Sequence, residues 1–208
     1  MRLEMVLSYN QQMLQKLLIA TTNIHKIQEF TSIFVNLPYM ITNPEIEKIN
    51  LKVDENGVSF SENALIKAKS YCKSSQMISM ADDSGLEIDA LGGRPGIYSA
   101  RYGGTKLNDK DRVKLILKQM SEVPKQKRQA RFRCAIAIAW PNGKTLIREG
   151  TLEGMIEFTQ KGCHGFGYDP IFYLPKYDKT VAELDPTQKN NISHRATAGK
   201  KILLHLNT

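Results

Sequence analysis

Two adjacent carboxylates follow a short apolar run near the middle of the chain. The run Met77–Ala81 is typical of a buried strand, and Asp82 and Asp83 follow it directly. Ser84 and Gly85 come next and predict a turn. An acidic pair where a strand gives way to a loop can hold a divalent metal ion or act as a base, because a strand end fixes side chains firmly. A plain polar turn between two strands would have the same sequence, so both interpretations stay open at this point.

A second polar segment, Thr21–Lys26, joins an expected strand, Lys16–Thr21, to an expected helix. Its threonines and asparagine are favoured at helix N-termini, and apolar residues at helical spacing follow it. Exposed backbone N–H groups at a helix N-terminus attract anions, and Lys26 in the first turn adds a full positive charge. The segment lacks the glycine spacing and the Lys-Ser/Thr pair of a Walker loop. A plain helix cap with a solvated lysine is therefore the alternative.

Two further charged residues fall on segments that can face the same site. Glu55 lies in a turn-rich segment, 38–58, and a helix is expected directly after it, over Ser59–Ser75. Lys67 lies at the edge of the apolar stripe of that helix, where its side chain can face a cleft. A solvated helix face is the alternative interpretation.

The last third of the chain holds a glycine-rich segment with aromatic and charged residues, 162–175. Glycine lets a backbone approach a ligand closely, and an aromatic ring such as that of Phe166 can stack on a nucleobase, a contact worth about 1–3 kcal/mol. An irregular loop with core aromatic residues is the alternative. Lys189, His194 and Arg195 form a cationic set that we expect just before a final amphipathic helix.

The elements that must position these residues indicate a mixed α/β domain built on a twisted sheet. A helix is expected over Asp109–Met120 after the N-cap residue Asn108. Strands are expected over Arg131–Trp140 and Thr145–Glu153, on either side of a hairpin turn. Large and small apolar residues alternate along Arg131–Trp140, which indicates a strand covered on both faces.

Composition limits the class of protein. At 208 residues the chain is long enough for a substantial core, and we expect a flexible N-terminal extension over residues 1–15 followed by one domain over 16–208. Three widely spaced cysteines indicate free thiols in a reducing cytoplasm. No apolar run reaches membrane-spanning length, and the N-terminus lacks the apolar core of a secretion signal. We therefore expect a cytoplasmic protein without a membrane partner.

The net charge of +8 allows two kinds of anionic partner. One is nucleic acid, bound through a basic surface, and the other is a small polyanion held in a pocket. The cationic cluster Lys125–Arg133 accounts for part of the charge, but its first half has no aromatic residues for base stacking. A stable complex with nucleic acid is therefore not expected.

Four motifs in sequence order resemble the inosine triphosphate pyrophosphatase family. They are ATTNIHK at Ala20–Lys26, FSENALIKA at Phe60–Ala68, ADDSGLEIDALGGRPGIYSARYGG at Ala81–Gly104, and GFGYDPIF at Gly165–Phe172 with KNNISHR at Lys189–Arg195. The resemblance runs from Lys16 to Leu206. It implies an elongated mixed central β-sheet with flanking helices, two lobes around a nucleotide-binding cleft, and a homodimer.

The resemblance also implies an activity and its residues. Members of the family hydrolyse a nucleoside triphosphate to the monophosphate and pyrophosphate with Mg²⁺. Asp83 matches the catalytic base and metal ligand, Glu55 matches a second metal ligand, and Asp82 supports the site from behind. The positions that match the phosphate-binding residues are Thr21, Thr22, Asn23, Ile24, His25, Lys26, Lys67 and Ser84. The positions that match the base-binding residues are Phe166, Gly167, Tyr168, Asp169, Lys189, His194 and Arg195.

Base selectivity follows from hydrogen-bond donors. Arginine and protonated lysine only donate, so they pair with the 6-keto oxygen of hypoxanthine or xanthine but leave the amino group of adenine unpaired, a mismatch of about 1–3 kcal/mol. The expected substrates are ITP, dITP and XTP, with ATP disfavoured and GTP not excluded. Two alternatives stay open: a nucleotide pyrophosphatase with another modified-base preference, and a non-catalytic basic protein that binds nucleotides or RNA.

The first motif departs from the family pattern Thr-Gly-Asn-x-Gly-Lys. Thr22 and His25 replace its two glycines, whereas Thr21, Asn23 and Lys26 keep the other positions. The replacements narrow the conformations open to this loop and bring a titratable imidazole to the phosphate end of the expected site.

Overall fold

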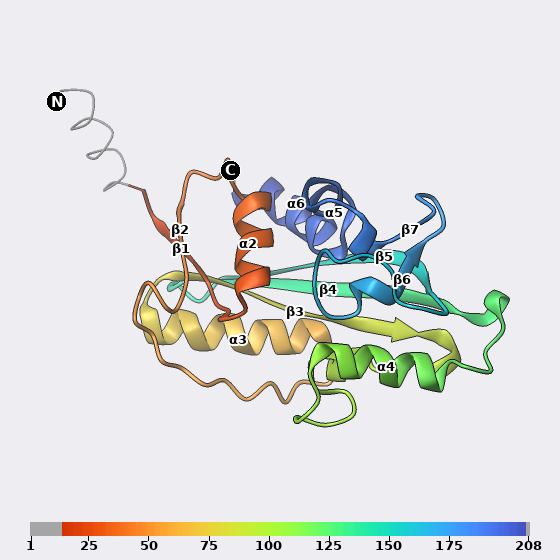
Figure 1. Cartoon of the computed structure of the whole chain (residues 1–208). Coiled ribbons are helices and arrows are strands. Elements are labelled where there is room, and N and C mark those ends of the chain that lie inside the picture. The colour runs from red at the N-terminus through yellow and green to blue at the C-terminus, as the bar shows by residue number, and fades with distance from the viewer. Residues whose placement is uncertain (1–13, 207–208) are drawn as a thin grey trace.

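A seven-stranded mixed sheet forms the centre of the protein (Figure 1). The computed structural model describes residues 14–206, so residues 1–13 of the expected extension lie outside the described residues. Strands β2, β1 and β3 are parallel, and the strands from β3 to β7 are antiparallel. In sheet order the strands are β2 (Met40–Thr42), β1 (Lys16–Ile19), β3 (Ile78–Ile88), β4 (Gln129–Ala139), β5 (Thr145–Ile156), β6 (Phe172–Leu174) and β7 (Lys179–Thr180). The predicted mixed α/β sheet is confirmed.

Helices cover both faces of this sheet (Figure 1). One face carries α2 (Ile24–Ile33), α5 (Pro186–Ile192) and α6 (His194–Leu206), and the opposite face carries α3 (Phe60–Ser75). Helix α4 (Asp109–Gln119) packs in a separate apolar cluster against Leu86 and Ile88 of β3 and Phe132 of β4. Short 3₁₀ turns complete the connections: η1 (Asp89–Leu91), η2 (Gly96–Arg101), η3 (Lys125–Lys127), η4 (Asp169–Ile171) and η5 (Val181–Glu183). The described helices include none with the length and apolar character needed to cross a bilayer. The division into two lobes stays a prediction.

Strand β4 shows why both faces are covered. Ile136 and Ile138 pack into the apolar cluster formed with α2 and α6. Ala135 and Ala137 alternate with them and face α3. Because successive side chains of a strand point to opposite faces, large residues fill one layer while alanines let α3 pack closely against the other. The predicted two-faced burial of this strand is confirmed.

Helix caps fix the ends of α3 and α4. The Ser59 hydroxyl accepts the backbone N–H of Glu62 at 3.2 Å, and the Asn108 side chain accepts that of Asp111 at 3.1 Å. Each bond satisfies one of the N–H groups that a helix leaves without an intrahelical partner. The predicted start of each helix is confirmed to within one residue.

The predicted turn at Ser84 and Gly85 is wrong, because β3 continues to Ile88. Strand β4 pairs with β3 along its length, from Ser79↔Ala139 to Ile88↔Ala130. These ladder hydrogen bonds outweigh the turn preference of serine and glycine. On the opposite edge, the register between β1 and β3 ends at Met80. Beyond Met80, β3 therefore has no β1 neighbour. Space opens beside Asp82 and Asp83 because β1 ends there, while β3 continues.

The placement of the cationic set before the last helix is also wrong. His194 and Arg195 are the first two residues of α6, and the hydroxyl of Ser193 accepts the N–H of Ala196 at 3.1 Å. Lys189 lies in α5, a short helix that the sequence analysis missed. Asp185 and Gln188 cap α5 reciprocally, and this capping box is visible in the sequence.

The cationic cluster at Lys125–Arg133 is mostly engaged within the fold. Arg128 is buried and donates to the carbonyl oxygens of Met120, Val123, Ile156 and Glu157. Arg131 and Arg133 form ion pairs with surface carboxylates. Three of its five cations, Arg128, Arg131 and Arg133, are therefore engaged within the fold, whereas Lys125 and Lys127 are exposed.

Candidate active site

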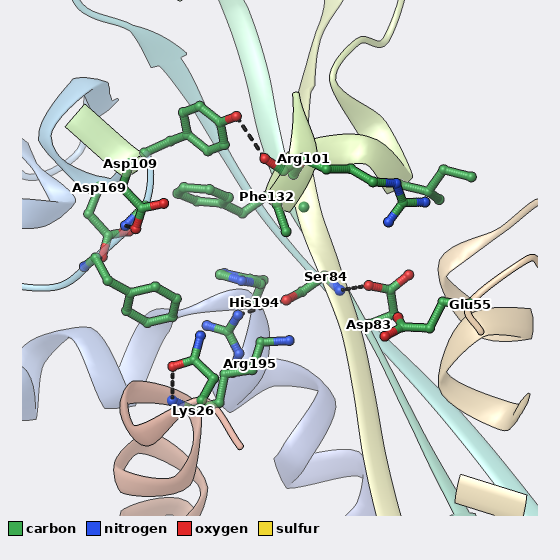
Figure 2. A pocket seen from close by; sticks show the side chains of 18 of the residues that line it. Lys26, Glu55, Asp83, Ser84, Arg101, Asp109, Phe132, Asp169, His194 and Arg195 are labelled. Atoms are coloured by element: carbon green, nitrogen blue, oxygen red, sulfur yellow. Dashed lines mark hydrogen bonds between the residues drawn. The ribbon is translucent and has the colours of Figure 1, made fainter. Parts of the chain in front are cut away.

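A pocket of about 230 Å³ opens where β1 leaves the edge of β3 (Figure 2). Ligands of open α/β sheets commonly bind at the carboxyl ends of such strands. The pocket gathers most of the predicted site residues: Asn23, Lys26, Glu55, Lys67, Asp83, Ser84, Phe166, Gly167, Tyr168, Asp169, His194 and Arg195. Five predicted residues do not line it: Thr21, Thr22, Ile24, His25 and Lys189.

The α2 N-terminus is capped by the protein itself. The Asn23 side-chain oxygen accepts the backbone N–H of His25 at 3.0 Å and that of Lys26 at 3.4 Å. The hydroxyl of Thr21 accepts the N–H of Asn23 at 3.2 Å. These N–H groups were expected to attract an anion, and in this arrangement Asn23 occupies two of them. Lys26 in the first turn of α2 brings a full positive charge to the wall of the pocket.

Asp82 lies behind the pocket wall and is buried. Its Oδ2 is 2.8 Å from Lys26 Nζ and 3.5 Å from Arg195 Nε, and it accepts the Ser84 hydroxyl at 3.1 Å. Burial raises the pKa of Asp82, but the charges of Lys26 and Arg195 lower it more, so the pKa falls well below its usual range. Asp82 is therefore a permanent anion that holds two cations in place.

Asp83 lies on the other face of β3, toward α3. Asn63 Nδ2 donates to its Oδ2 at 3.0 Å, and the N–H of Ser84 bonds its Oδ1 at 2.9 Å. Burial raises the pKa of Asp83, and neighbouring Glu55 raises it further against the opposing effect of Asn63 and Lys67. A carboxylate with a raised pKa that faces a pocket has the properties of a general base.

Asp83 and Glu55 form an acidic corner of the pocket, and Lys67 lies beside them. Lys67 Nζ lies 3.0 Å from Glu55 Oε2 and donates to the backbone oxygen of Asp82 at 2.9 Å. That oxygen lies on the edge of β3 that β1 has left. The predicted orientation of Lys67 toward a cleft is confirmed.

Asn63 is a site residue that the sequence analysis missed. Its side chain is buried between two parts of the acidic corner, since Nδ2 donates to Asp83 and Oδ1 accepts the N–H of Gly57 at 2.8 Å. It thereby ties the segment that carries Glu55 to the strand that carries Asp83. A buried asparagine on the apolar stripe of the predicted helix was the signal.

A chain of buried ion pairs leads from Arg195 to the glycine-rich segment. Arg195 Nη1 lies 2.8 Å from Glu29 Oε2, and Glu29 Oε1 lies 2.7 Å from Lys189 Nζ. Lys189 also lies 2.6 Å from Asp169 Oδ2, which accepts the N–H of Phe166 at 2.8 Å. Burial raises the pKa of Glu29, but Arg195 and Lys189 outweigh it and lower that pKa. Lys189 thus anchors the loop of Phe166 and does not face the pocket.

Glu29 was missed because a charged residue on an α2 helix face is solvated by default. Its partners lie far along the chain, since Arg195 comes 166 positions after Glu29. Sequence spacing holds no trace of such a contact. The one local signal is that Glu29 falls beside Phe30 on the face of α2 that packs into the core.

Phe166 forms part of a group of stacked rings. His25 lies against it with ring centroids 5.1 Å apart and planes 12° apart, and the Lys189 ammonium lies 4.7 Å from its centroid. His194 stacks on Phe132 at 4.9 Å. Burial and the charge of Arg195 lower the pKa of His194 well below its usual value, so its imidazole is neutral. Its Nδ1 has no hydrogen-bond partner among the described residues.

Two more pocket residues had been assigned no role. Asp109, the first residue of α4, accepts the N–H of Gly167 at 3.1 Å and so ties this helix to the glycine-rich segment. Arg101, the last residue of η2, is exposed and lines the same pocket. Both fall within or next to the longest recognised motif, but nothing in their spacing indicated a pocket.

The acidic corner fits a magnesium ion. Mg²⁺ is usually held by one or two carboxylates, with waters and substrate phosphates as the other ligands. Asp83 and Glu55 both line the pocket, and the charge of Glu55 contributes to the raised pKa of Asp83. Residues 14–206 contain no cluster of three or more His, Cys, Asp or Glu residues that could hold a metal ion. The donor set therefore matches a site that is completed by a phosphate ligand.

A sequence profile of the Ham1 family matches residues 17–205. The chain belongs to the Ham1 family. The family that the sequence motifs resemble is thereby confirmed.

Curated relatives in the family have similar lengths. The dITP/XTP pyrophosphatase of Halalkalibacterium halodurans is 45% identical over 189 residues, which cover 89% of this chain and 95% of the relative. The dITP/XTP pyrophosphatase of Oceanobacillus iheyensis is 46% identical over 193 residues, which cover 89% of this chain and 94% of the relative. Among solved structures, the Ham1 protein of Staphylococcus aureus matches with a TM-score of 0.83 at 39% identity, covering 93% of this chain and 98% of that one.

Proposed function

We propose that this protein is a Mg²⁺-dependent pyrophosphatase that hydrolyses ITP, dITP and XTP to the nucleoside monophosphate and pyrophosphate. The observation that carries the proposal is that Asp83 and Arg195 line one pocket, with Lys26 and Lys67 beside them. The names of the relatives within the Ham1 family support the same activity.

Asp83 acts as the base in this proposal. It takes one proton from water as the phosphoanhydride bond between the α and β phosphates breaks. The water oxygen ends on one phosphate product and the bridging oxygen on the other. Asn63 orients the carboxylate by donating to Oδ2, which leaves Oδ1 held by a single backbone N–H.

Asp83 and Glu55 would hold the magnesium ion. When bound, Mg²⁺ lowers the pKa of coordinated water and neutralises phosphate charge. Lys67 and Lys26 are placed to neutralise charge on the nonbridging phosphate oxygens, which carry it in a loose transition state. Lys67 pairs with Glu55 at 3.0 Å, so it would be available for this role once Glu55 held the metal ion.

The other end of the pocket reads the base. Arg195 lines the pocket and is fixed there by Glu29 and Ser84, which accept from Nη1 and Nη2, and each of these nitrogens carries a second N–H. A 6-keto oxygen can accept from such donors, whereas the 6-amino group of adenine cannot. His194 adds a neutral imidazole whose Nδ1 is free to bond a base. Buried polar groups left unpaired by the wrong base give strong discrimination.

Release of pyrophosphate from ITP, dITP, XTP, dUTP, GTP and ATP tests the proposal. We expect fast turnover of the first three with Mg²⁺ and little turnover of ATP or dUTP. Equal turnover of ATP and ITP would remove the base-reading assignment. Absence of turnover with every nucleotide would favour a non-catalytic nucleotide-binding protein.

The proposal also includes a homodimer and a cytoplasmic location. Analytical ultracentrifugation tests the first, with a mass of twice the 23.5 kDa chain expected. A single species at the chain mass would contradict it.

A further inference from the structure

The cations that line the pocket are mostly committed to carboxylates of the protein. Lys26 pairs with Asp82 at 2.8 Å, and Lys67 pairs with Glu55 at 3.0 Å. Arg195 pairs with Glu29 at 2.8 Å. A polyphosphate that enters therefore meets cations whose charge is already largely compensated.

The charge balance of the connected groups makes this plain. Four cations are set against five carboxylates: Lys26, Lys67, Lys189 and Arg195 against Glu29, Glu55, Asp82, Asp83 and Asp169. With all nine groups ionised, their net charge is −1 before a nucleoside triphosphate arrives. The distal phosphates carry most of the substrate charge, so they need a cation outside this set in addition to the metal ion.

Arg101 is such a cation. It lines the pocket, it is exposed, and no carboxylate of residues 14–206 forms an ion pair with it. Its described partner is the ring of Tyr98, whose centroid lies 4.9 Å from the guanidinium carbon. Figure 2 shows the Arg101 side chain on the side of the pocket where Asp83 and Glu55 lie.

The backbone that carries Arg101 is held firmly against β3. The Ser99 hydroxyl accepts the N–H of Leu86 at 2.8 Å and donates to the Gly96 oxygen at 2.7 Å. The backbone carbonyl oxygen of Ser99 accepts a hydrogen bond from the Tyr168 hydroxyl at 2.9 Å. At Gly85 a side chain would overlap Ser99 and Gly96, so this glycine lets η2 lie directly on the strand. An exposed cationic side chain thus extends from a fixed segment and lines the pocket that Asp83 also lines.

We propose that Arg101 binds the β and γ phosphates of the substrate and then the pyrophosphate product. A guanidinium suits this task, because its planar fork can donate two parallel hydrogen bonds to phosphate oxygens. Arg101 moves from Tyr98 to the phosphates when the substrate enters. This inference rests on the proposed pyrophosphatase activity and adds a residue that contacts the leaving portion of the substrate.

Binding of the two products separates this role from a structural one. Isothermal titration with inorganic pyrophosphate and, separately, with IMP is made in the presence of Mg²⁺ on the wild-type protein, Arg101→Ala, Arg101→Lys and Arg94→Ala. Arg94 is the matched control, since it is an exposed arginine of the same connection and lies outside the pocket. We expect Arg101→Ala to bind pyrophosphate about ten- to hundredfold more weakly while its affinity for IMP stays within twofold.

Arg101→Lys keeps the charge but loses the fork, so we expect an intermediate loss for pyrophosphate. Arg94→Ala is expected to bind both products as the wild type does. Pyrophosphate binding by Arg101→Ala that equals that of Arg94→Ala would overturn the inference, and so would an equal loss for IMP. If the wild-type protein binds neither product and releases no pyrophosphate from ITP, the proposed function fails instead.

Discussion

Two neighbouring aspartates on opposite faces of strand β3 have pKa values shifted in opposite directions. On one face, Asp82 is buried against Lys26 and Arg195, and their charges lower its pKa. On the other, Asp83 meets Asn63 and the edge of the pocket, and burial raises its pKa. Successive residues of a strand point to opposite faces, so a single strand supplies both environments.

The opposite pKa shifts of the two aspartates indicate a structural role for one and a catalytic role for the other. A carboxylate with a lowered pKa is a poor base but a durable partner for cations, and Asp82 uses it to fix the residues of the pocket wall. A carboxylate with a raised pKa binds protons more readily and has direct access to the ligand. We infer that Asp82 holds the cations of the pocket wall in position and that Asp83 acts as the base.

Asp83→Asn is expected to have the largest effect on activity. Asparagine keeps the shape of the side chain but cannot take a proton, so turnover of ITP should fall by about 10²–10⁴-fold. The thermal unfolding midpoint should stay close to that of the wild type, because no buried ion pair is lost. Retained turnover in a folded variant would show that Asp83 is not the base.

Asp82→Asn is expected to act mainly on stability. It leaves Lys26 and Arg195 without their shared anion, and breaking such a buried pair destabilises a protein by about 3–5 kcal/mol. Urea denaturation measures the change. Asp89→Asn is the matched control, because its pairing with Arg131 is at the surface and its loss changes stability by less than about 1 kcal/mol. Equal effects of the two substitutions would contradict the contrast between the faces.

The pH dependence of stability sharpens the same point. The pKa of Asp82 is lower in the folded state than in the unfolded chain, so its contribution is complete above the unfolded value of about 3.9. The contribution declines as pH falls below that value. The difference in unfolding free energy between the wild type and Asp82→Asn should therefore shrink between pH 5 and pH 3, as measured by urea denaturation at each pH. A difference that grows on acidification would contradict this sign.

Gly85→Ala tests the close approach of η2 to β3. The added methyl group would overlap Ser99 and the Gly96 backbone, so we expect a loss of about 1–3 kcal/mol in unfolding free energy. Because η2 carries Arg101, the affinity for pyrophosphate should fall as well. An unchanged unfolding midpoint together with unchanged pyrophosphate binding would show that η2 is free to move.

His25→Gly is expected to have the smallest effect. It restores the residue that the family pattern has at this position and removes the ring stacked on Phe166. An aromatic pair contributes about 0.5–1.5 kcal/mol, so the KM for ITP should fall by about two- to tenfold once a base no longer competes with His25. His25→Ala, which removes the ring without the flexibility of glycine, serves as the control. A raised KM in both variants would mean that His25 supports the base.

The sequence predicted the fold well where the signals were local. Ser59 and Asn108 mark helix starts through hydrogen bonds that span only three residues, and the alternation of β4 reports its two neighbours directly. It failed at Ser84 and Gly85, because their strand conformation depends on β4, whose sequence lies about fifty positions further on. Turn preference is weak against a complete ladder of hydrogen bonds.

The candidate site divides in the same way. The motifs led to Asp83, Lys67 and Arg195, which do line one pocket. Glu29 and Asn63 were missed because their roles depend on partners brought together by the fold. Lys189 was expected to face the base, but the fold surrounds its ammonium with Glu29 and Asp169.

A crystal structure of the wild-type protein with Mg²⁺ and an ITP analogue, in which a methylene group replaces the oxygen that bridges the α and β phosphates, tests the central claim most directly. We predict the triphosphate beside Glu55 and Lys67 with the metal ion bound there, and the 6-keto edge of the hypoxanthine within hydrogen-bond distance of Arg195. Hypoxanthine in the acidic corner, or a nucleotide bound away from β3, would contradict the account.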